Sequence, residues 1–166
     1  MNNGKNQKGF SLIELLCVVV VIGIVAAIGI PNLTASRRAA NESSAISSVR
    51  ALIGAQASYQ STTGDGEFAP NFTLLRNQGL VESVLATGIK SGFSFEIGAN
   101  STGPAAQYDV SAHPTRYGHL ASTGTRSFYT NELGMMYSVS ADIPNTAGWG
   151  ISTTVRTPTT GAPLTN

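Results

Sequence analysis

One carboxylate, Glu14, stands within the most apolar stretch of the sequence. The stretch runs from Phe10 to Ile30, FSLIELLCVVVVIGIVAAIGI, and Glu14 is its one acidic or basic side chain. An unpaired carboxylate among leucine and isoleucine side chains is strongly disfavoured away from water. Glu14 lies four residues after Phe10, roughly 6 Å along a helix, so it can partly reach the polar edge of the segment. We therefore expect Glu14 either to stay at that edge or to meet a positively charged partner.

The other residues that could do chemistry form no catalytic or metal-binding pattern. His113 and His119 lie six residues apart in a region containing proline and glycine, and we expect structural or exposed histidines. The run Gly64-Asp65-Gly66-Glu67 has the glycines of a calcium loop but not its alternating oxygen ligands, which predicts a surface turn. Cys17 is the single cysteine, so an intramolecular disulfide and a CxxC zinc site are excluded. We predict neither a metal nor a cofactor, and Cys17 is interpreted as a small hydrophobic residue.

Composition excludes further classes of protein. Of the 166 residues, 42% are hydrophobic and 11% are charged, which is too apolar for a disordered tail. Ten Lys and Arg residues against nine Asp and Glu residues give a net charge of +1. This balance gives no basis for electrostatic capture of nucleic acid, and we infer no nucleic-acid partner.

The apolar stretch is long enough to cross a membrane. A helix of 21 residues, 10–30, is about 31 Å long, close to the hydrocarbon thickness of a bilayer. A buried core helix would be shorter and would carry a polar stripe, whereas the residues from Leu15 to Ile30 are apolar or small all round. Lys5 and Lys8 precede the stretch with no acidic residue, which predicts a single span with a cytoplasmic N-terminus.

A cleaved secretory signal peptide is the main alternative for this segment, because it also has a basic start and an apolar run. Its cleavage site would fall in residues 31–36, which include small residues. A helical pattern continues directly through these residues, so cleavage there would remove the start of the next helix. A signal peptide also gives no reason for the carboxylate of Glu14.

The segment Lys8-Gly9-Phe10-Ser11-Leu12-Ile13-Glu14-Leu15 resembles the signature of the type IV pilin and pseudopilin family: a basic residue, Gly, Phe, a small hydroxyl residue, two aliphatic residues and Glu. The resemblance implies a leader of residues 1–9. It implies cleavage between Gly9 and Phe10 by a membrane aspartyl prepilin peptidase, which also methylates the new amino group of Phe10.

The same resemblance implies how the chain assembles. Glu14 would meet the amine of Phe10 on its own or a neighbouring subunit, and the region of Gly23 and Pro31 would break the helix by local unwinding in the assembled filament. The implied partners are further copies of the chain, the prepilin peptidase, an inner-membrane assembly platform and, before assembly, the lipid bilayer. The implied location is the bacterial inner membrane and afterwards an extracellular or periplasmic filament.

We expect an α+β fold in which one long N-terminal helix packs on a small antiparallel sheet, as in pilins. Residues 31–62 continue the helix as an amphipathic segment, in which we place Glu42 and Ser48 with the polar residues between the apolar positions. Residues 63–156 form the globular region, and residues 157–166 an irregular tail. Within the globular region we predict helical turns at 71–76 and 79–86 with a stop at Gly88, strands at 93–97, 108–110, 127–130 and 135–139, and turns at 98–103 and 131–134.

Three functional classes fit this organisation to different degrees. The first is a structural subunit of a type IV pilus or pilus-like filament, and the second is the major, G-type pseudopilin of a type II secretion system. The third, a membrane-tethered enzyme, is disfavoured because residues 63–166 contain no catalytic constellation. Some secretion pseudopilins bind calcium in a C-terminal loop, but Asp142 stands alone in that region, so we predict no calcium site.

Overall fold

The computed structural model describes residues 9–100, 106–118, 121–140 and 162–164. It divides into two compact units, Met1–Ser36 and Arg37–Asn166. We call the part of the helix before Arg37 the stalk and everything from Arg37 onward the head. In chain order the elements are α1 (Leu12–Thr62), α2 (Phe72–Asn77), the 3-10 turn η1 (Leu85–Thr87), β1 (Ile89–Lys90), β2 (Phe93–Asn100), β3 (Gln107–Pro114), β4 (Ser127–Asn131), β5 (Met136–Val139) and β6 (Ala162–Pro163).

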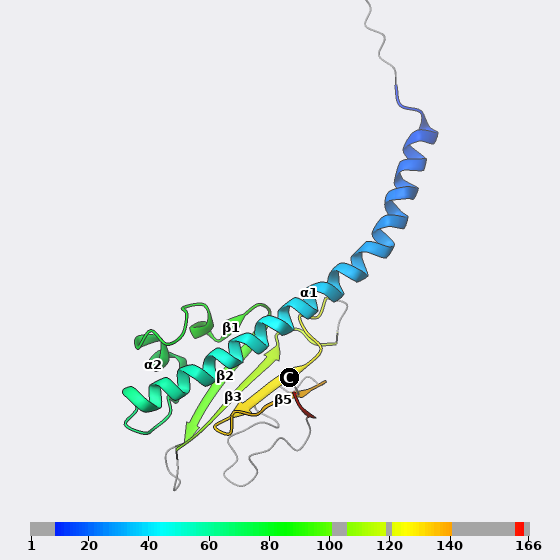
Figure 1. Cartoon of the computed structure of the whole chain (residues 1–166). Coiled ribbons are helices and arrows are strands. Elements are labelled where there is room, and N and C mark those ends of the chain that lie inside the picture. Colours follow the sequence, from blue (N-terminus) through cyan, green and yellow to red (C-terminus); the bar gives the residue numbers. More distant parts are fainter. Residues whose placement is uncertain (1–8, 101–105, 119–120, 141–161, 165–166) are drawn as a thin grey trace, which may run out of the picture. The chain divides into compact units, whose positions relative to one another are not determined.

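The head has the expected α+β architecture. All six strands form one antiparallel sheet in the order β1-β2-β3-β4-β5-β6, so each strand pairs with its neighbours in sequence. The second part of α1 lies along one face of this sheet (Figure 1). The core between them is apolar, and its largest fully buried side chains include Leu52, Val49, Phe93 and Phe128. The rings of Phe93 and Phe128 lie 5.9 Å apart between centroids.

The buried face of α1 in the head differs from the predicted one at two polar positions. Its buried residues recur every three or four positions and are Glu42, Ala45, Ser48, Val49, Leu52, Ala55 and Gln56. The placement of Glu42 and Ser48 among the exposed polar residues was therefore wrong. Glu42 is buried because groups from the sheet satisfy its charge, and Gln56 because the backbone of Ala69 both donates to it and accepts from it, each at 2.9 Å.

The smaller elements follow the sequence prediction with several corrections. The helix at 71–76 is confirmed as α2, which Asn71 caps by accepting a hydrogen bond from the amide of Leu74. Of the helical turns expected at 79–86, only the short turn η1 forms, and the left-handed Gly88 stops it as predicted. The predicted strands are confirmed as β2 to β5. The turn expected at 98–103 was wrong for its first three residues, which continue β2, and β6 shows that the 157–166 tail is not wholly irregular.

The stalk helix is continuous. Pro31 lies inside α1 without ending it, and Gly23 is also helical. A proline in a helix removes one N–H donor, which leaves the other hydrogen bonds of the ladder available. The hydroxyl of Thr34 donates to the carbonyl of Pro31 at 2.8 Å. The structure describes the chain alone, so unwinding between Gly23 and Pro31 in a filament stays a prediction.

Candidate functional site at the start of helix α1

Glu14 closes the first turn of α1 by accepting a hydrogen bond from the chain just before it. Its Oε2 atom accepts from the backbone N–H of Ser11 at 2.9 Å, and the carbonyl of Ser11 accepts from the amide of Leu15 at 3.2 Å. Ser11 therefore stands at the N-cap and Glu14 at the third helical position, the spacing S-x-x-E of a capping box. The sequence contained this signal, but the prediction that Glu14 lies at the polar edge or meets a positive partner made no use of it.

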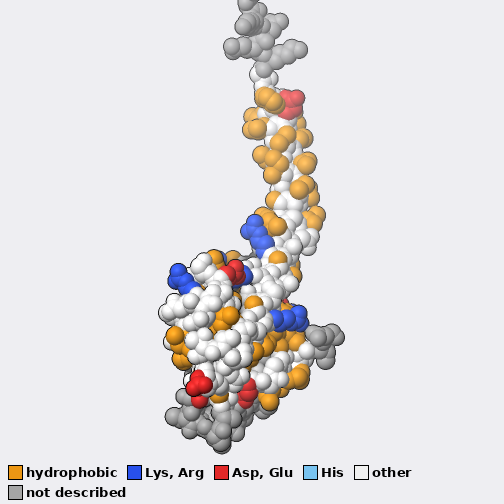
Figure 2. Space-filling view, turned by 60° about the vertical axis from the view of Figure 1, so that its left-hand side comes forward, with side chains coloured by type: hydrophobic (Ala, Val, Ile, Leu, Met, Phe, Trp, Pro, Cys, Tyr) orange, Lys and Arg blue, Asp and Glu red, His pale blue; other side chains and the backbone are white. Residues whose placement is uncertain are grey.

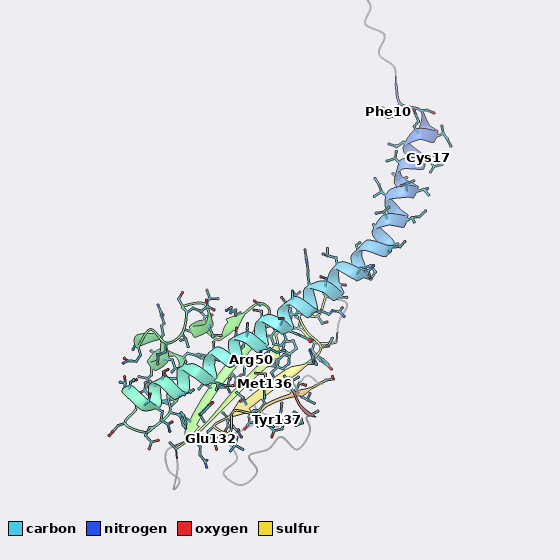
Figure 3. The ribbon with its side chains drawn as sticks, in the orientation of Figure 1. Phe10, Cys17, Arg50, Glu132, Met136 and Tyr137 are labelled. Atoms are coloured by element: carbon cyan, nitrogen blue, oxygen red, sulfur yellow. The ribbon has the colours of Figure 1, made fainter. Side chains whose placement is uncertain are left out.

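The peptide bond expected to be cleaved is open to a protease. Gly9 and Phe10 precede α1, and nothing lies within 4 Å of the position that a side chain at Gly9 would occupy. The side chain of Phe10 is 89% exposed and projects from the start of the helix (Figure 3). Residues 1–8, including Lys5 and Lys8, lie outside the described residues.

Glu14 shares one side of the helix with apolar residues. Phe10, Ile13, Glu14, Cys17 and Val18 line a shallow hollow of about 390 Å³. Cys17 is exposed, and the other residues that line this hollow are apolar except for Glu14. The carboxylate of Glu14 is therefore the one acidic group among the residues that line this hollow.

The remainder of the stalk is an apolar surface with no partner in the described chain. Every Leu, Val and Ile side chain from Leu12 to Leu33 is at least 52% exposed. Hydrophobic side chains cover this part of α1 on the face seen in Figure 2. The helix is long and apolar enough to cross a membrane by its length and composition. Exposed apolar surface of this extent is typical of a segment that contacts a membrane or another protein.

Inside the head, Glu42 joins α1 to the start of β4. Its carboxylate accepts hydrogen bonds from the backbone N–H and the hydroxyl of Thr125, both at 2.7 Å, and it pairs with Arg126 at 2.8 Å. Burial raises the pKa of Glu42, but the hydrogen bonds from Thr125 and the hydrogen bond and charge of Arg126 outweigh burial and lower the pKa below its ordinary value of 4.5. One residue earlier, Asn41 donates to the carbonyl of Thr123 at 3.0 Å. These contacts fix the segment before β4 onto the helix.

The histidine and calcium-loop candidates from the sequence lie away from both Glu14 and Glu42. His113 lies in β3, where it pairs with Ser94, although the proline and glycine around it in the sequence are typical of a loop. His119 and Asp142 lie outside the described residues. Asp65 and Gly66 have positive φ angles and form the turn after α1, as predicted. Within the described ranges, no three His, Cys, Asp or Glu side chains are grouped so that they could hold a metal ion.

Comparison with known proteins finds one family model and several curated relatives that each match part of the chain. Residues 4–30 match the family described as the prokaryotic N-terminal methylation motif. The type IV wide pilus major component PilA4 of Thermus thermophilus is 45% identical over 56 residues, which cover 34% of this chain and 43% of that protein. The type II secretion system core protein G of Escherichia coli is 37% identical over 54 residues, covering 32% of this chain and 37% of that protein.

A third relative, the type IV major pilin protein PilA of Myxococcus xanthus, is 46% identical over 53 residues, covering 32% of this chain and 24% of that protein. The matched segment thus spans less than half the length of each of these relatives. No solved structure matches the chain significantly. The chain thus carries the methylation motif at residues 4–30 and is similar, over about a third of its length, to type IV pilins and to type II secretion system core protein G.

Proposed function

We propose that this chain is a structural subunit of a type IV pilus or pilus-like filament. Before assembly it is held in the bacterial inner membrane by the stalk as a single span, with its N-terminus in the cytoplasm. A prepilin peptidase removes residues 1–9 and methylates Phe10, and an inner-membrane assembly platform delivers the subunit to the filament. The relatives are named as pilus and secretion-system components rather than as enzymes, and we propose no catalytic activity.

The observation that carries this proposal is the exposed apolar stalk with a single carboxylate in its first turn. In a stalk that served only as a lipid anchor, Glu14 would do no more than cap the first turn of the helix. A charge at the centre of a bilayer costs about 2.5 to 3.5 kcal/mol. A stalk that leaves the bilayer to pack among copies of itself keeps its apolar surface covered by neighbouring helices. In that packed core a carboxylate requires a positive partner.

Cleavage supplies a positive group at a suitable place. Removal of residues 1–9 leaves a new amine on Phe10, one residue before Ser11, whose amide already contacts Glu14 at 2.9 Å. The amine can pair with Glu14 of its own chain or of the neighbouring chain. Pairing with a neighbour fixes the axial offset between two stalks, because only one offset brings the two charges together.

Shearing of surface filaments tests the proposal directly. We expect filaments by negative-stain microscopy in the sheared fraction, with this chain as their dominant component and with a mature N-terminus at Phe10. Absence of filaments, combined with a chain that stays in the membrane fraction under conditions that permit assembly, would overturn it. A mature chain that begins near Ala35 would instead support a cleaved signal peptide.

A second candidate function is that of a type II secretion pseudopilin, which forms a short assembly from the same kind of subunit. The protein G relatives favour it, for example those of Escherichia coli and Aeromonas hydrophila, which are 37% and 36% identical over 54 and 56 residues. Deletion of the gene distinguishes the two. Loss of surface filaments with normal protein secretion supports the pilus, and accumulation of unsecreted proteins in the periplasm supports the pseudopilin.

A further inference from the structure

The charged side chains of the head are distributed unevenly between its two ends. Arg37 and Arg38 are the first two residues of the head, and they follow a run of residues, 15–36, that contains no acidic or basic side chain. Asp65 and Glu67 lie just beyond the last turn of α1. On the face seen in Figure 2, the blue Lys and Arg side chains of the head lie in the half where α1 enters it. We call the part of the head around Arg37 and Arg38 the basic end, and the opposite part, around Asp65 and Glu67, the far end.

The loop that carries Arg116 is fastened to the basic end. The amide of Arg116 donates to the hydroxyl of Thr123 at 3.3 Å, and the carbonyl of Arg116 accepts from the amide of Thr123 at 2.9 Å. The side chain of Asn41, one helical turn after Arg37, donates to the carbonyl of Thr123 at 3.0 Å. Thr123 also packs so closely on Gly92 that a Cβ atom there would lie 2.8 Å from its side chain. Arg116 is exposed, and these contacts hold it at the basic end although it is distant from Arg37 in the sequence.

The acidic residue of the basic end does not offset these arginines. Glu42 is the acidic residue nearest to Arg37 in the sequence, but it is buried and its carboxylate pairs with Arg126 at 2.8 Å. Within the described ranges, neither Arg37 nor Arg116 forms an ion pair with an acidic side chain. The charge that the basic end presents to its surroundings is therefore positive.

The basic end begins where the apolar surface of the stalk ends. Leu33 is 52% exposed and precedes Arg37 by four residues, which is about 6 Å along a helix. The apolar part of α1 is long enough to cross a membrane. When it does so, Arg37 comes to the level of the lipid headgroups. Arginine pairs with phosphate oxygens through two parallel hydrogen bonds, and its long side chain can cover apolar surface while its charged group stays in water.

We propose that the basic end binds the phosphate groups of anionic lipids in the outer leaflet of the inner membrane before the subunit assembles, through Arg37, Arg38 and Arg116. This inference rests on the proposed function in one respect, because it requires the stalk to span the membrane. Along α1, Arg37 and Thr62 are 25 residues apart, roughly 38 Å of helix. Charges are screened within about 8 Å at physiological salt, so the acidic residues of the far end do not weaken the contact. The lipid surface thus orients the head with its basic end inward.

Quenching of a fluorescent label by lipid headgroups measures this contact in the full chain. In a Cys17→Ala background, the label is attached to Ala121→Cys in the Arg116 loop or to Ser61→Cys near the end of α1, since both positions are exposed. The chain is reconstituted into vesicles of phosphatidylcholine, or of an equal mixture of phosphatidylcholine and phosphatidylglycerol, with the same trace of headgroup-nitroxide phosphatidylcholine as quencher. The Ala121→Cys label is expected to be quenched more strongly in the anionic vesicles. The difference should disappear between about 0.1 M and about 1 M salt, and the Ser61→Cys label should be quenched in neither kind of vesicle.

Single arginine substitutions identify the side chains that make the contact. In anionic vesicles, Arg116→Gln and Arg37→Gln are each expected to lower the ratio of bound to unbound heads about fivefold, the usual contribution of one basic residue near an anionic surface. The matched control is Arg76→Gln, because Arg76 is exposed on α2, outside the basic end, and its substitution removes the same charge. It should leave the quenching unchanged.

The outcomes separate this inference from the function on which it rests. Equal quenching of the Ala121→Cys label in the two kinds of vesicle, quenching that salt does not change, or equal quenching of the Ser61→Cys label overturns the lipid contact and leaves the filament proposal standing. An effect of Arg116→Gln no larger than that of Arg76→Gln also overturns it. The comparison of lipids and salt uses the unsubstituted arginines, so it remains decisive if a variant fails to fold. A chain that alkaline carbonate extracts from the vesicles does not span the membrane, which overturns the proposed function as well.

Discussion

The backbone amide of Ser11 donates to the carboxylate of Glu14 over 2.9 Å, so the side chain expected to guide assembly also caps the stalk helix. Two roles therefore coincide on one carboxylate. Capping requires a hydrogen-bond acceptor and can be served by Gln as well as by Glu, whereas pairing with an amine requires the negative charge. This difference allows the two roles to be tested separately.

Substitution of Glu14 by Gln and by Ala is expected to abolish or sharply reduce filaments in both cases, with membrane insertion and leader cleavage largely intact. Gln keeps the acceptor for Ser11 and removes the charge, and Ala removes both. Comparison of the processed membrane pool with the sheared filament yield measures the effect. Assembly by Glu14→Gln at the wild-type level, with failure of Glu14→Ala, would show that Glu14 acts only as a cap. Wild-type yield from Glu14→Ala would contradict any role in assembly.

Cleavage is expected between Gly9 and Phe10, with a methyl group on the new amine. Loss of residues 1–9 removes Lys5 and Lys8, which leaves eight basic against nine acidic side chains and changes the formal charge from +1 to −1. Gly9→Val should block cleavage without disturbing the precursor, because nothing lies within 4 Å of a side chain placed there. Intact-mass analysis of the membrane-extracted chain checks both statements. A fully processed Gly9→Val chain would argue against a peptidase that selects glycine at this position.

In the assembled filament, α1 is expected to lose helical structure between Gly23 and Pro31. The isolated helix is continuous there, but Pro31 cannot donate to the ladder, and Gly23 and Gly29 hold the helical conformation weakly. Local unwinding would let the subunit lengthen while its two helical parts pack differently. A filament map at side-chain resolution provides the measurement, with Pro31→Ala as the variant expected to keep more helix. Unbroken helical density through Ile28 and Pro31 in wild-type filaments would refute the prediction.

Glu42 is expected to stabilise the head in a pH-dependent way. Glu42→Gln should lower the free energy of unfolding by about 1 to 3 kcal/mol, because it removes a charged acceptor that serves Thr125 and Arg126. The folded-state pKa of Glu42 lies below 4.5, so this contribution is present above that pH and is lost as the pH falls through the lowered value. Urea unfolding of the detergent-solubilised chain at pH 7 and at pH 3.5 tests both points.

The matched control for Glu42 is Glu82→Gln, which breaks the ion pair between Glu82 and Lys90. The side chain of Glu82 is 54% exposed. Such pairs contribute about 0 to 1 kcal/mol. An effect of Glu42→Gln no larger than that of Glu82→Gln, or a loss of stability that does not shrink at the lower pH, would contradict the assignment.

The sequence was most informative where a pattern depends on neighbouring residues. The stalk, the end of α1 at Thr62 and the central strands were predicted because apolar periodicity and turn residues act over a few positions. The burial of Glu42 was not predicted because its partners Thr125 and Arg126 lie more than 80 residues away in the sequence. No local sequence pattern indicates such distant partners. The two-residue strands β1 and β6 were missed because they are defined only by pairing with β2 and β5.

At the candidate site, the motif predicted Gly9, Phe10 and Glu14 but not the hydrogen bond between Ser11 and Glu14. The S-x-x-E spacing of a helix cap was present in the sequence. It was not recognised because Glu14 was interpreted only as a charge within an apolar segment.

The short edge strands β1 and β6 limit edge-to-edge aggregation between sheets of neighbouring heads. Proteins with long, unpaired outer strands tend to join edge to edge into amyloid-like ribbons. In this head the described sheet ends in two-residue strands on both sides, and β6 contains Pro163, which has no N–H to offer a foreign strand. In the proposed filament, such short edges would give neighbouring heads little backbone to pair through. If contacts between heads in the proposed filament involve side chains rather than shared strands, the filament can be separated again into intact, reusable subunits.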